Sequence, residues 1–404
     1  MTEELRPRLR PVELMPVQAE GRELVALHDP DRYAQDTAIV APEALPLLGL
    51  FDGTRTLRDM QVELMRQGAS LIPIETLEEL TSSLDRCLLL DNERFRQTRA
   101  ERERAFAEQP VRAAVHAGSA YPAQAEDARA FLDGITGPVE PAPQGVLRRL
   151  IAPHIDLRLG ADVHGAAGAA LRAAGRPDVV VVLGVCHAAC EHNFIACRKD
   201  FETPFGLVPH DGAFLDRLEA RLGADVTRGQ IVHQAEHSVE FQALWLAHLW
   251  PDDPPALVPF LVGSFHEHIL AGTDPGKDDE VARFCEALRA TIAEDGRRVL
   301  VLASVDLSHM GPRYGHDEGL DEAAEGRLER EDEDVLERML AGDAEGFFRS
   351  VARDENARNV CGVAPIYVTL KVGEGTGRLL RYGQGRIDPE SGSVVSYAAM
   401  AFED

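Results

Sequence analysis

Residues 179–187 have the sequence Val-Val-Val-Val-Leu-Gly-Val-Cys-His, and this stretch decides the fold class. The run from Val179 to Gly184 contains no polar side chain and is rich in β-branched residues. A strand that is apolar on both faces is typical of a parallel sheet with helices on both sides. Cys186 and His187 follow directly, so a chemically active pair is expected where this strand ends.

Similar apolar strands are expected on both sides of this stretch along the chain. They are Leu147 to Ala152, Ala256 to Val262, Val299 to Ser304 and Val394 to Phe402. Helical patterns separate them, at Gly165 to Ala174, Asp211 to Leu222, His237 to Leu249, Asp278 to Glu294 and Asp332 to Leu340. This alternation predicts an α/β domain with a largely parallel sheet that is covered by helices on both faces.

Polar clusters follow three of the expected strands, one of which is the strand at 179–184 described above. The strand at 147–152 leads into His154 and Asp156, and the strand at 299–304 leads into Asp306, Ser308 and His309. A single histidine at a strand end is usually structural. Several that reach one edge of one sheet form a candidate site, because ligands of α/β folds bind at the carboxyl ends of strands.

Two further features leave alternatives open. Glu236-His237-Ser238-Val239-Glu240 opens a helix, so its carboxylates are either favoured by the helix dipole or orient an acid–base histidine. Cys361 by itself says little, since unpaired cysteines are commonly buried. Cys186, Cys190 and Cys197 lack the paired C-x-x-C spacing, which disfavours a structural zinc knuckle.

The composition excludes several classes of function. Lys and Arg number 42 and Asp and Glu 68, a formal charge of −26 that repels nucleic acid. No apolar run approaches the roughly 20 residues of a membrane span. Residues 1–10 are charged and lack the apolar core of a signal peptide, so we expect a cytoplasmic protein without membrane association. Six cysteines in 404 residues do not suggest a disulfide framework.

We expect three segments along the chain. Residues 1–96 form a small α+β unit, with short strands at 24–29 and 37–41, a helix at 42–51, a helix capped by Thr54 or Thr56, and a third helix that starts at Glu75 or Thr76. Residues 97–110 are a charged, helical linker. Residues 111–404 form the α/β domain.

Nine motifs in this order together resemble the Memo family, whose prokaryotic members are called AmmeMemoRadiSam system protein B. The motifs span residues 111–402 and lie at 115–121, 151–154, 183–187, 203–206, 236–240, 258–263, 304–311, 361–362 and 394–399. The resemblance implies a fold similar to the class III extradiol dioxygenases, which are non-haem iron enzymes. It also implies that His154, His187 and Cys361 bind a metal.

The resemblance further places His116, His237, Asp306 and His309 in the surrounding pocket. Iron is the expected metal, with copper or zinc as alternatives because a thiolate is a soft ligand. The chain departs from the family pattern at Ile155-Asp156-Leu157, at Val185-Cys186 and at Ala364. Asp156 and Cys186 are therefore expected to add an anion and a thiol beside the two histidines.

The N-terminal segment resembles PqqD-like winged-helix domains over residues 20–95, through residues 51–56 and 88–91. Such domains are similar to modules that recognise leader peptides beside radical enzymes. The resemblance implies a peptide or protein substrate that binds this domain, and a radical SAM enzyme as a partner.

Our first functional hypothesis is a non-haem metal oxidoreductase, in which His237 or His309 moves protons and Glu240 or Asp306 orients them. The alternative is a metal-binding module that binds a peptide or protein without turnover. A zinc hydrolase is a third reading, disfavoured because the chain has no H-E-x-x-H sequence.

Overall fold

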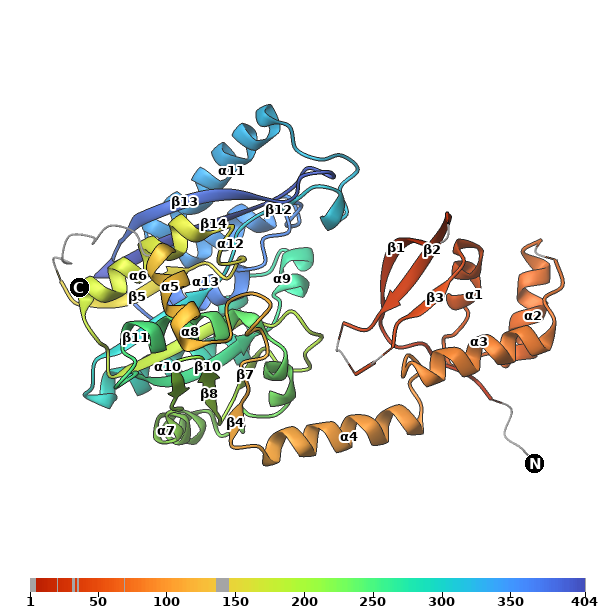
Figure 1. Ribbon diagram of the computed structural model, residues 1–404, viewed down its shortest axis with the longest axis horizontal. Coiled ribbons are helices and arrows are strands. Elements are labelled where there is room, and N and C mark those ends of the chain that lie inside the picture. The colour runs from red at the N-terminus through yellow and green to blue at the C-terminus, as the bar shows by residue number, and fades with distance from the viewer. Residues whose placement is uncertain are drawn as a thin grey trace. The chain divides into compact units, whose positions relative to one another are not determined.

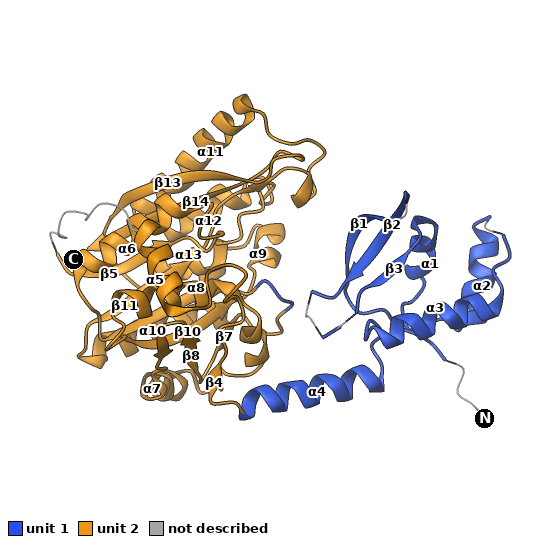
Figure 2. Ribbon diagram, viewed as in Figure 1, with its two compact units in different colours: residues 1–108, 187–189 blue, residues 109–186, 190–404 orange. Residues whose placement is uncertain are grey.

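The structure is a computed structural model that describes residues 5–19, 21–30, 33–34, 36–68, 70–135 and 145–403. The chain forms two compact units, one of residues 1–108 with 187–189 and one of residues 109–186 with 190–404 (Figure 2). Along the chain, Cys186 alone separates residues 187–189 from the strand β6 (Val179–Val185) of the second unit.

The first unit contains a small antiparallel sheet and a set of helices. The sheet has the order β1-β2-β3, formed by β1 (Glu13–Ala19), β2 (Arg22–His28) and β3 (Ala38–Val40). The short η1 (Pro42–Ala44) and α1 (Leu45–Leu48) come next, and then α2 (Leu57–Arg66), α3 (Ile74–Arg86) and α4 (Glu93–Glu108).

Most of the strands and helices of this unit were predicted from the sequence. Thr56 caps α2, because its side chain accepts the backbone N–H of Asp59 while the Asp59 carboxylate accepts the N–H of Thr56. The strand β1 was not expected, and nearly all of its residues are exposed. A strand without an alternating buried face carries no periodic signal.

The second unit is built on an eight-stranded mixed sheet (Figure 1). Its centre is parallel, in the order β5-β11-β6-β10, with β5 (Leu147–Ala152), β11 (Val299–Ser304) and β10 (Ala256–Val262) beside β6. The observed bounds of β5, β10 and β11 thus agree with the strands predicted at 147–152, 256–262 and 299–304. A separate small sheet joins β4 (Val111–Arg112), β8 (Asp200–Thr203) and β9 (Gly206–Val208).

The expectation of a largely parallel sheet was too strong. The strands β7 (Phe194–Ala196), β12 (His309–Met310), β13 (Gly377–Asp388) and β14 (Ser393–Glu403) are antiparallel to their neighbours. A short turn joins β13 to β14, and a connection of that length permits only an antiparallel pair.

Helices cover both faces of this sheet. Alternate residues of β6, including Val179, Val181 and Leu183, belong to one apolar core with Phe284 and Ile366. That core contains α7 (Gly212–Leu222), α10 (Asp279–Asp295), α11 (Glu322–Leu340), α12 (Ala344–Ala352) and α13 (Val363–Lys371). A second layer contains α5 (Ala125–Ile135), α6 (Ala161–Ala174) and α8 (His237–Leu249), which contact one another. The short α9 (His266–Ala271), η2 (Gln230–Gln234), η3 (Pro275–Lys277) and η4 (Pro312–Tyr314) lie in connections.

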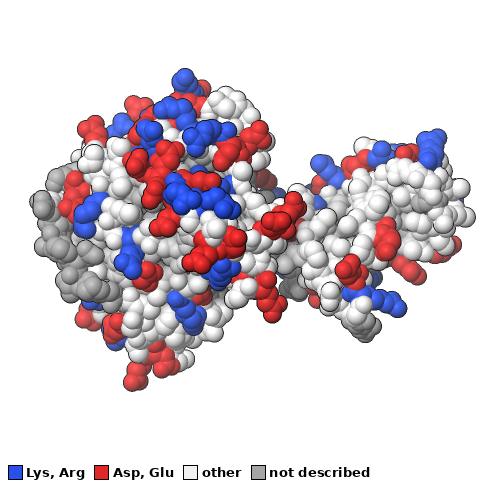
Figure 3. Space-filling model, turned by 90° about the horizontal axis from the view of Figure 1, so that it is seen from above, with Lys and Arg blue, Asp and Glu red and all other residues white. Residues whose placement is uncertain are grey.

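The surface carries both signs of charge. On the face drawn in Figure 3, acidic and basic side chains lie interspersed. Within the described ranges, no helix has both the length and the apolar character that crossing a bilayer requires.

Candidate metal centre

The parallel strands bring three polar loops to one edge of the sheet. His154 follows β5, Asp306 follows β11 and His187 follows β6, and these strands are adjacent in the order β5-β11-β6. Parallel neighbours end at the same edge, so residues that are far apart in sequence meet there. This edge is the one at which the sequence predicted a site.

Within the described ranges, three histidines form a group of side chains that could hold one metal ion. One ring nitrogen each of His154, His187 and His237 lies within 4.8 Å of the other two. The ring of His237 approaches that of His154 edge to face, with 5.0 Å between the ring centroids. A spacing of this kind suits ligation of one metal ion by several imidazoles.

Cys361 lies beside this group. Its Sγ is 3.6 Å from His154 Nε2 and 3.6 Å from the carbonyl oxygen of Asp306. Burial, and then the charge of Asp306, raise the pKa of the Cys361 thiol well above its usual value. The thiol is therefore protonated at neutral pH in the metal-free protein, and metal binding must displace that proton.

The tautomer of His154 is determined by its second nitrogen. Nδ1 lies 2.9 Å from the carbonyl oxygen of Ser304, to which it must donate its hydrogen. Nε2 then carries a lone pair, and this atom faces Cys361. A backbone carbonyl that fixes a histidine in this way is typical of metal ligands.

Asp306 holds the loop that carries His154. Its Oδ1 accepts the backbone N–H groups of His154 and Ile155, both at 3.1 Å, and its Oδ2 lies 3.6 Å from His154 Nε2. A carboxylate so close to the ring also provides negative charge for a cation. The hydrogen bonds hold His154 in place, and the negative charge of Asp306 favours a cation at this edge.

Buried polar groups hold α8 against the two strand ends. Gln242 donates its side-chain N–H to the carbonyl oxygen of Pro153 and to Ser304 Oγ, at 3.0 and 2.9 Å. Ser304 Oγ in turn donates to the carbonyl oxygen of Ser238, at 2.6 Å. The sequence analysis missed Gln242, whose only signal is a polar residue on the buried side of a helix.

The carboxylate beside His237 is Glu236 rather than Glu240. Glu236 Oε1 lies 3.1 Å from His237 Nδ1 and accepts the backbone N–H of Ser238 as the N-cap of α8. The side chain of His237 remains about a third exposed, at 31%. This pairing holds the His237 ring at the start of α8.

Glu240 has a different environment. Its carboxylate accepts hydrogen bonds from the guanidinium of Arg112, the hydroxyl of Tyr121 and the backbone N–H of His116. Arg112 is fully buried and also donates to the carbonyl oxygens of His233 and Glu236. The sequence analysis did not single out Arg112, because nothing near it in the chain marks a buried ion pair.

His116 and His309 line the surroundings of the site. The ring of His116 packs edge to face on His237 with centroids 5.9 Å apart, and burial lowers its pKa, so it is neutral. His309 Nδ1 lies 3.0 Å from the carbonyl oxygen of Leu307, and its ring packs on Tyr314 at 5.0 Å. Tyr314 was not foreseen. Burial, and then the charge of Asp306, raise the pKa of Tyr314, so its phenol keeps its proton.

One expected site residue lies elsewhere. Asp156 is exposed, its Oδ1 accepts the backbone N–H groups of Arg158 and Leu159, and its Oδ2 is 3.7 Å from an Arg158 nitrogen. In the described part of the chain it thus closes a turn and does not add an anion beside the histidines. Cys186 is half-buried, and its backbone N–H donates to Val262 at 3.0 Å.

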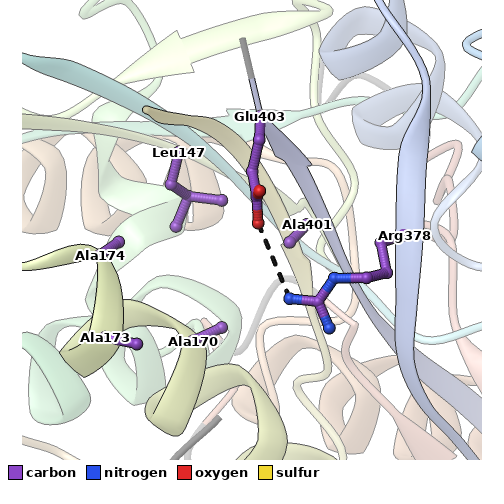
Figure 4. Close-up of a pocket in the computed structure, with 7 residues that line it drawn as sticks. All are labelled: Leu147, Ala170, Ala173, Ala174, Arg378, Ala401 and Glu403. Atoms are coloured by element: carbon purple, nitrogen blue, oxygen red, sulfur yellow. Dashed lines mark ion pairs between the residues drawn. The ribbon is translucent and has the colours of Figure 1, made fainter. Parts of the chain in front are cut away.

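A separate small pocket lies at the opposite end of β5 (Figure 4). An ion pair between Arg378 and Glu403, at 3.7 Å, spans it, and Leu147 and several alanines line it. Its volume is about 10 Å³, which is room for one water molecule. It does not take part in the site.

Residues 112–401 match the model of the family described as Memo-like protein. A protein of Aquifex aeolicus named MEMO1 family protein is 29% identical over an alignment of 404 positions, which covers 98% of this chain and all of the relative. A MEMO1 family protein of Thermus thermophilus is 29% identical over 85% of this chain and 98% of its own length.

A third relative is shorter. The MEMO1 family protein of Methanosarcina mazei is 28% identical over 71% of this chain, yet the match covers 97% of that protein. Relatives of this kind therefore differ in whether they carry a counterpart of the whole chain or of about three quarters of it.

Proposed function

This chain belongs to the Memo family, and on that premise we propose that it is a metal-dependent oxidoreductase with its site at the carboxyl edge of the central sheet. The observation that carries the proposal is the meeting of His154, His187 and His237, with the Cys361 thiol 3.6 Å from His154 Nε2. These four donors come from separate segments of the chain. His154 is buried, His237 is partly exposed and His187 is exposed, so the group is accessible to a metal ion from solvent.

We assign His154, His187 and Cys361 as the metal ligands, and iron as the metal, with copper or zinc as alternatives. The donors fit a divalent transition metal, because imidazole and thiolate both bind such ions and the His154 tautomer presents Nε2. A second assignment replaces Cys361 by His237, whose ring nitrogen belongs to the tight group. The two assignments differ in whether the thiol loses its proton on metal binding.

A bound iron ion would supply redox chemistry and open coordination positions for substrate and oxygen. In this proposal His237 moves a proton at Nε2, while the Glu236 carboxylate 3.1 Å from Nδ1 orients the ring. Asp306 positions His154, and Glu240 with Arg112 positions His116. His309 is the alternative proton carrier, with Nδ1 held by Leu307.

Metal analysis of protein purified without oxygen tests the proposal. We expect about one iron per chain in the parent protein and none in His154→Ala. The variants Cys361→Ala and His237→Ala separate the two ligand assignments. Only the substitution that removes a true ligand should lower the metal content strongly. Nitric oxide, a probe for open positions on ferrous iron, should change the electron paramagnetic resonance spectrum. A metal-free parent protein would overturn the metal function.

A second candidate function is recognition of a peptide by the N-terminal unit. The strand β1 is an edge strand of its sheet, and Leu14 and Met15 on it are 52% and 49% exposed. An extended peptide can bind such an edge by adding a strand. The resemblance to PqqD-like domains favours a peptide or protein substrate and a radical SAM enzyme as partner.

A binding screen of extended peptides distinguishes this candidate from the oxidoreductase. Peptides that bind the whole chain should lose binding when residues 1–100 are deleted, while the metal content stays the same. Peptides that bind the deletion variant equally well would exclude the N-terminal unit as the recognition module.

A further inference from the structure

The segment that delivers Cys361 is not a regular element. Residues 355–361, here called the thiol arm, connect the region after α12 to α13. Glu355, Asn356 and Asn359 have left-handed backbone, with φ of 55°, 58° and 50°. Only one other described non-glycine residue, Leu88, has positive φ. Asparagine adopts this conformation more readily than most residues, whereas at Glu355 it is costly and persists only when its surroundings hold it.

The loop after β11 provides these surroundings. The backbone N–H of His309 donates to the carbonyl oxygen of Arg358 at 2.7 Å, and the Asn359 amide donates to that of Tyr314 at 3.1 Å. His316 Nε2 lies 3.0 Å from the carbonyl oxygen of Ala357. The thiol arm and the loop at 305–316 are thus joined at several points, and both carry residues of the site.

One buried carboxylate ties the two segments together. Asp332, on α11, is fully buried, and its Oδ1 accepts from Arg358 of the thiol arm at 2.8 Å and from Ser308 of the β11 loop at 2.7 Å. Its Oδ2 accepts from the hydroxyl groups of Tyr382 and Ser396. Arg358 is almost fully buried, and its other acidic neighbour, Glu331, is 4.0 Å away and exposed.

We propose that Asp332 is a positioning residue for the metal centre, which acts through Arg358 and Ser308 to hold the Cys361 thiol and the His309 ring against the strand-end histidines. The physical reason is the strain in the thiol arm. Without the carboxylate, Arg358 is a buried cation with no close anion, and its cheapest response is to move toward solvent. The strained backbone then relaxes and takes Cys361 with it.

The part of this proposal that concerns metal rests on the proposed function, whereas the part that concerns the position of the thiol does not. The first experiment therefore needs no metal. The metal-free parent protein and Asp332→Asn are treated with iodoacetamide, and alkylation of each cysteine is followed by peptide mass spectrometry. We expect Cys361 to react at least about tenfold faster in the variant, as local opening exposes it. Cys186 and Cys190, which are also half-buried, serve as references within the same protein.

A matched control exists in the first unit. Asp29 accepts two hydrogen bonds from Arg10 at 2.9 and 3.0 Å, and both side chains are as buried as those of Asp332 and Arg358. Asp29→Asn makes the same chemical change without touching the thiol arm, so the Cys361 rate should stay at the parent value. Arg358→Lys, which keeps the charge but not the fork of donors, should give an intermediate rate and remains informative if Asp332→Asn does not fold.

Cobalt(II) then tests the link to the metal. We expect the parent protein to show a thiolate-to-cobalt charge-transfer band, and Asp332→Asn to bind cobalt through histidines without that band. Equal Cys361 alkylation rates in parent and variant would overturn the positioning role, and so would an unchanged band. A parent protein that binds no cobalt would overturn the proposed metal site, while the alkylation rates would still decide the role of Asp332.

Discussion

His154 and Cys361 lie 3.6 Å apart, yet the chain delivers them in opposite ways. His154 follows a buried parallel strand and is held by Ser304 and Asp306 at the end of the neighbouring strand. Cys361 ends a strained arm whose hydrogen bonds run to a loop and to a buried carboxylate on α11. The strand side of the site is determined by the sheet, and the arm side depends on contacts that can be lost one at a time.

The largest expected effect is on the strand side. His154→Ala removes a ligand that the sheet holds in place and that both proposed ligand sets include. We expect the metal affinity to fall by more than the roughly 10- to 100-fold that loss of a ligand's supporting hydrogen bond costs. Isothermal titration with the metal measures this, and circular dichroism should show an unchanged fold.

His210→Ala is the control for this change. His210 is paired with Asp200 at 2.8 Å and lies before α7, away from the strand-end loops. Its loss should leave metal affinity unchanged. An equal loss of affinity in both variants would mean that His154 is not a ligand.

The next effect is on stability at acid pH. His164 on α6 supports the loop after His154 through Nε2 and the carbonyl oxygen of Ile155, and burial lowers its pKa to about 4. Between pH 6.5 and 4 the unfolded chain binds a proton that the folded chain does not, so stability falls as the pH falls through this window. The loss from one such group is about 3 kcal/mol.

Urea unfolding at pH 7 and pH 4.5 measures this loss for the parent protein and for His164→Asn. The variant should lose less stability between the two pH values. His233, whose pKa burial also lowers to about 4, keeps its own contribution in both proteins. An unchanged pH dependence in the variant would show that His164 is protonated in the folded protein.

A smaller effect is expected on the arm side. Because the Cys361 thiol has a raised pKa, it must release a proton to bind metal, and raising the pH favours the form that binds. Above about pH 7.5, where exposed histidines are neutral, metal affinity should still rise about tenfold per pH unit. In Cys361→Ala this dependence should disappear.

His237→Ala provides the comparison for this slope. If Cys361 is the ligand, His237→Ala keeps the pH dependence above pH 7.5. A flat profile in the parent protein would instead favour the assignment in which the three histidines bind the metal without the thiol.

The smallest effect is expected from the N-terminal unit. Deletion of residues 1–100 should leave the metal content of the chain unchanged, since every proposed ligand lies beyond residue 150 and the family match begins at residue 112. Metal analysis of the parent and truncated proteins checks this. Loss of metal from a truncated protein that is otherwise folded would show that the N-terminal unit contributes to the metal site.

The sequence by itself determined the strand side of this protein. The strands at 147–152, 256–262 and 299–304 and the helix at 237–249 were predicted with their observed bounds. Their signals are local, because a continuous apolar run can only be a buried strand or helix and its flanking residues show which. Because adjacent parallel strands end at the same edge of a sheet, His154, Asp306 and His187 meet there.

Only the tertiary structure decided the rest. It paired His237 with Glu236, placed Glu240 against Arg112 and Tyr121, and turned Asp156 outward into a turn. It also placed Cys361 of the thiol arm 3.6 Å from His154 Nε2. The contacts of Glu240 and of Cys361 join residues far apart in sequence, and those of Glu236 and Asp156 depend on side-chain directions that no periodic pattern predicts. Hydrogen bonds between buried polar groups depend on distances of a few tenths of an ångström, and these exist only once the chain has folded.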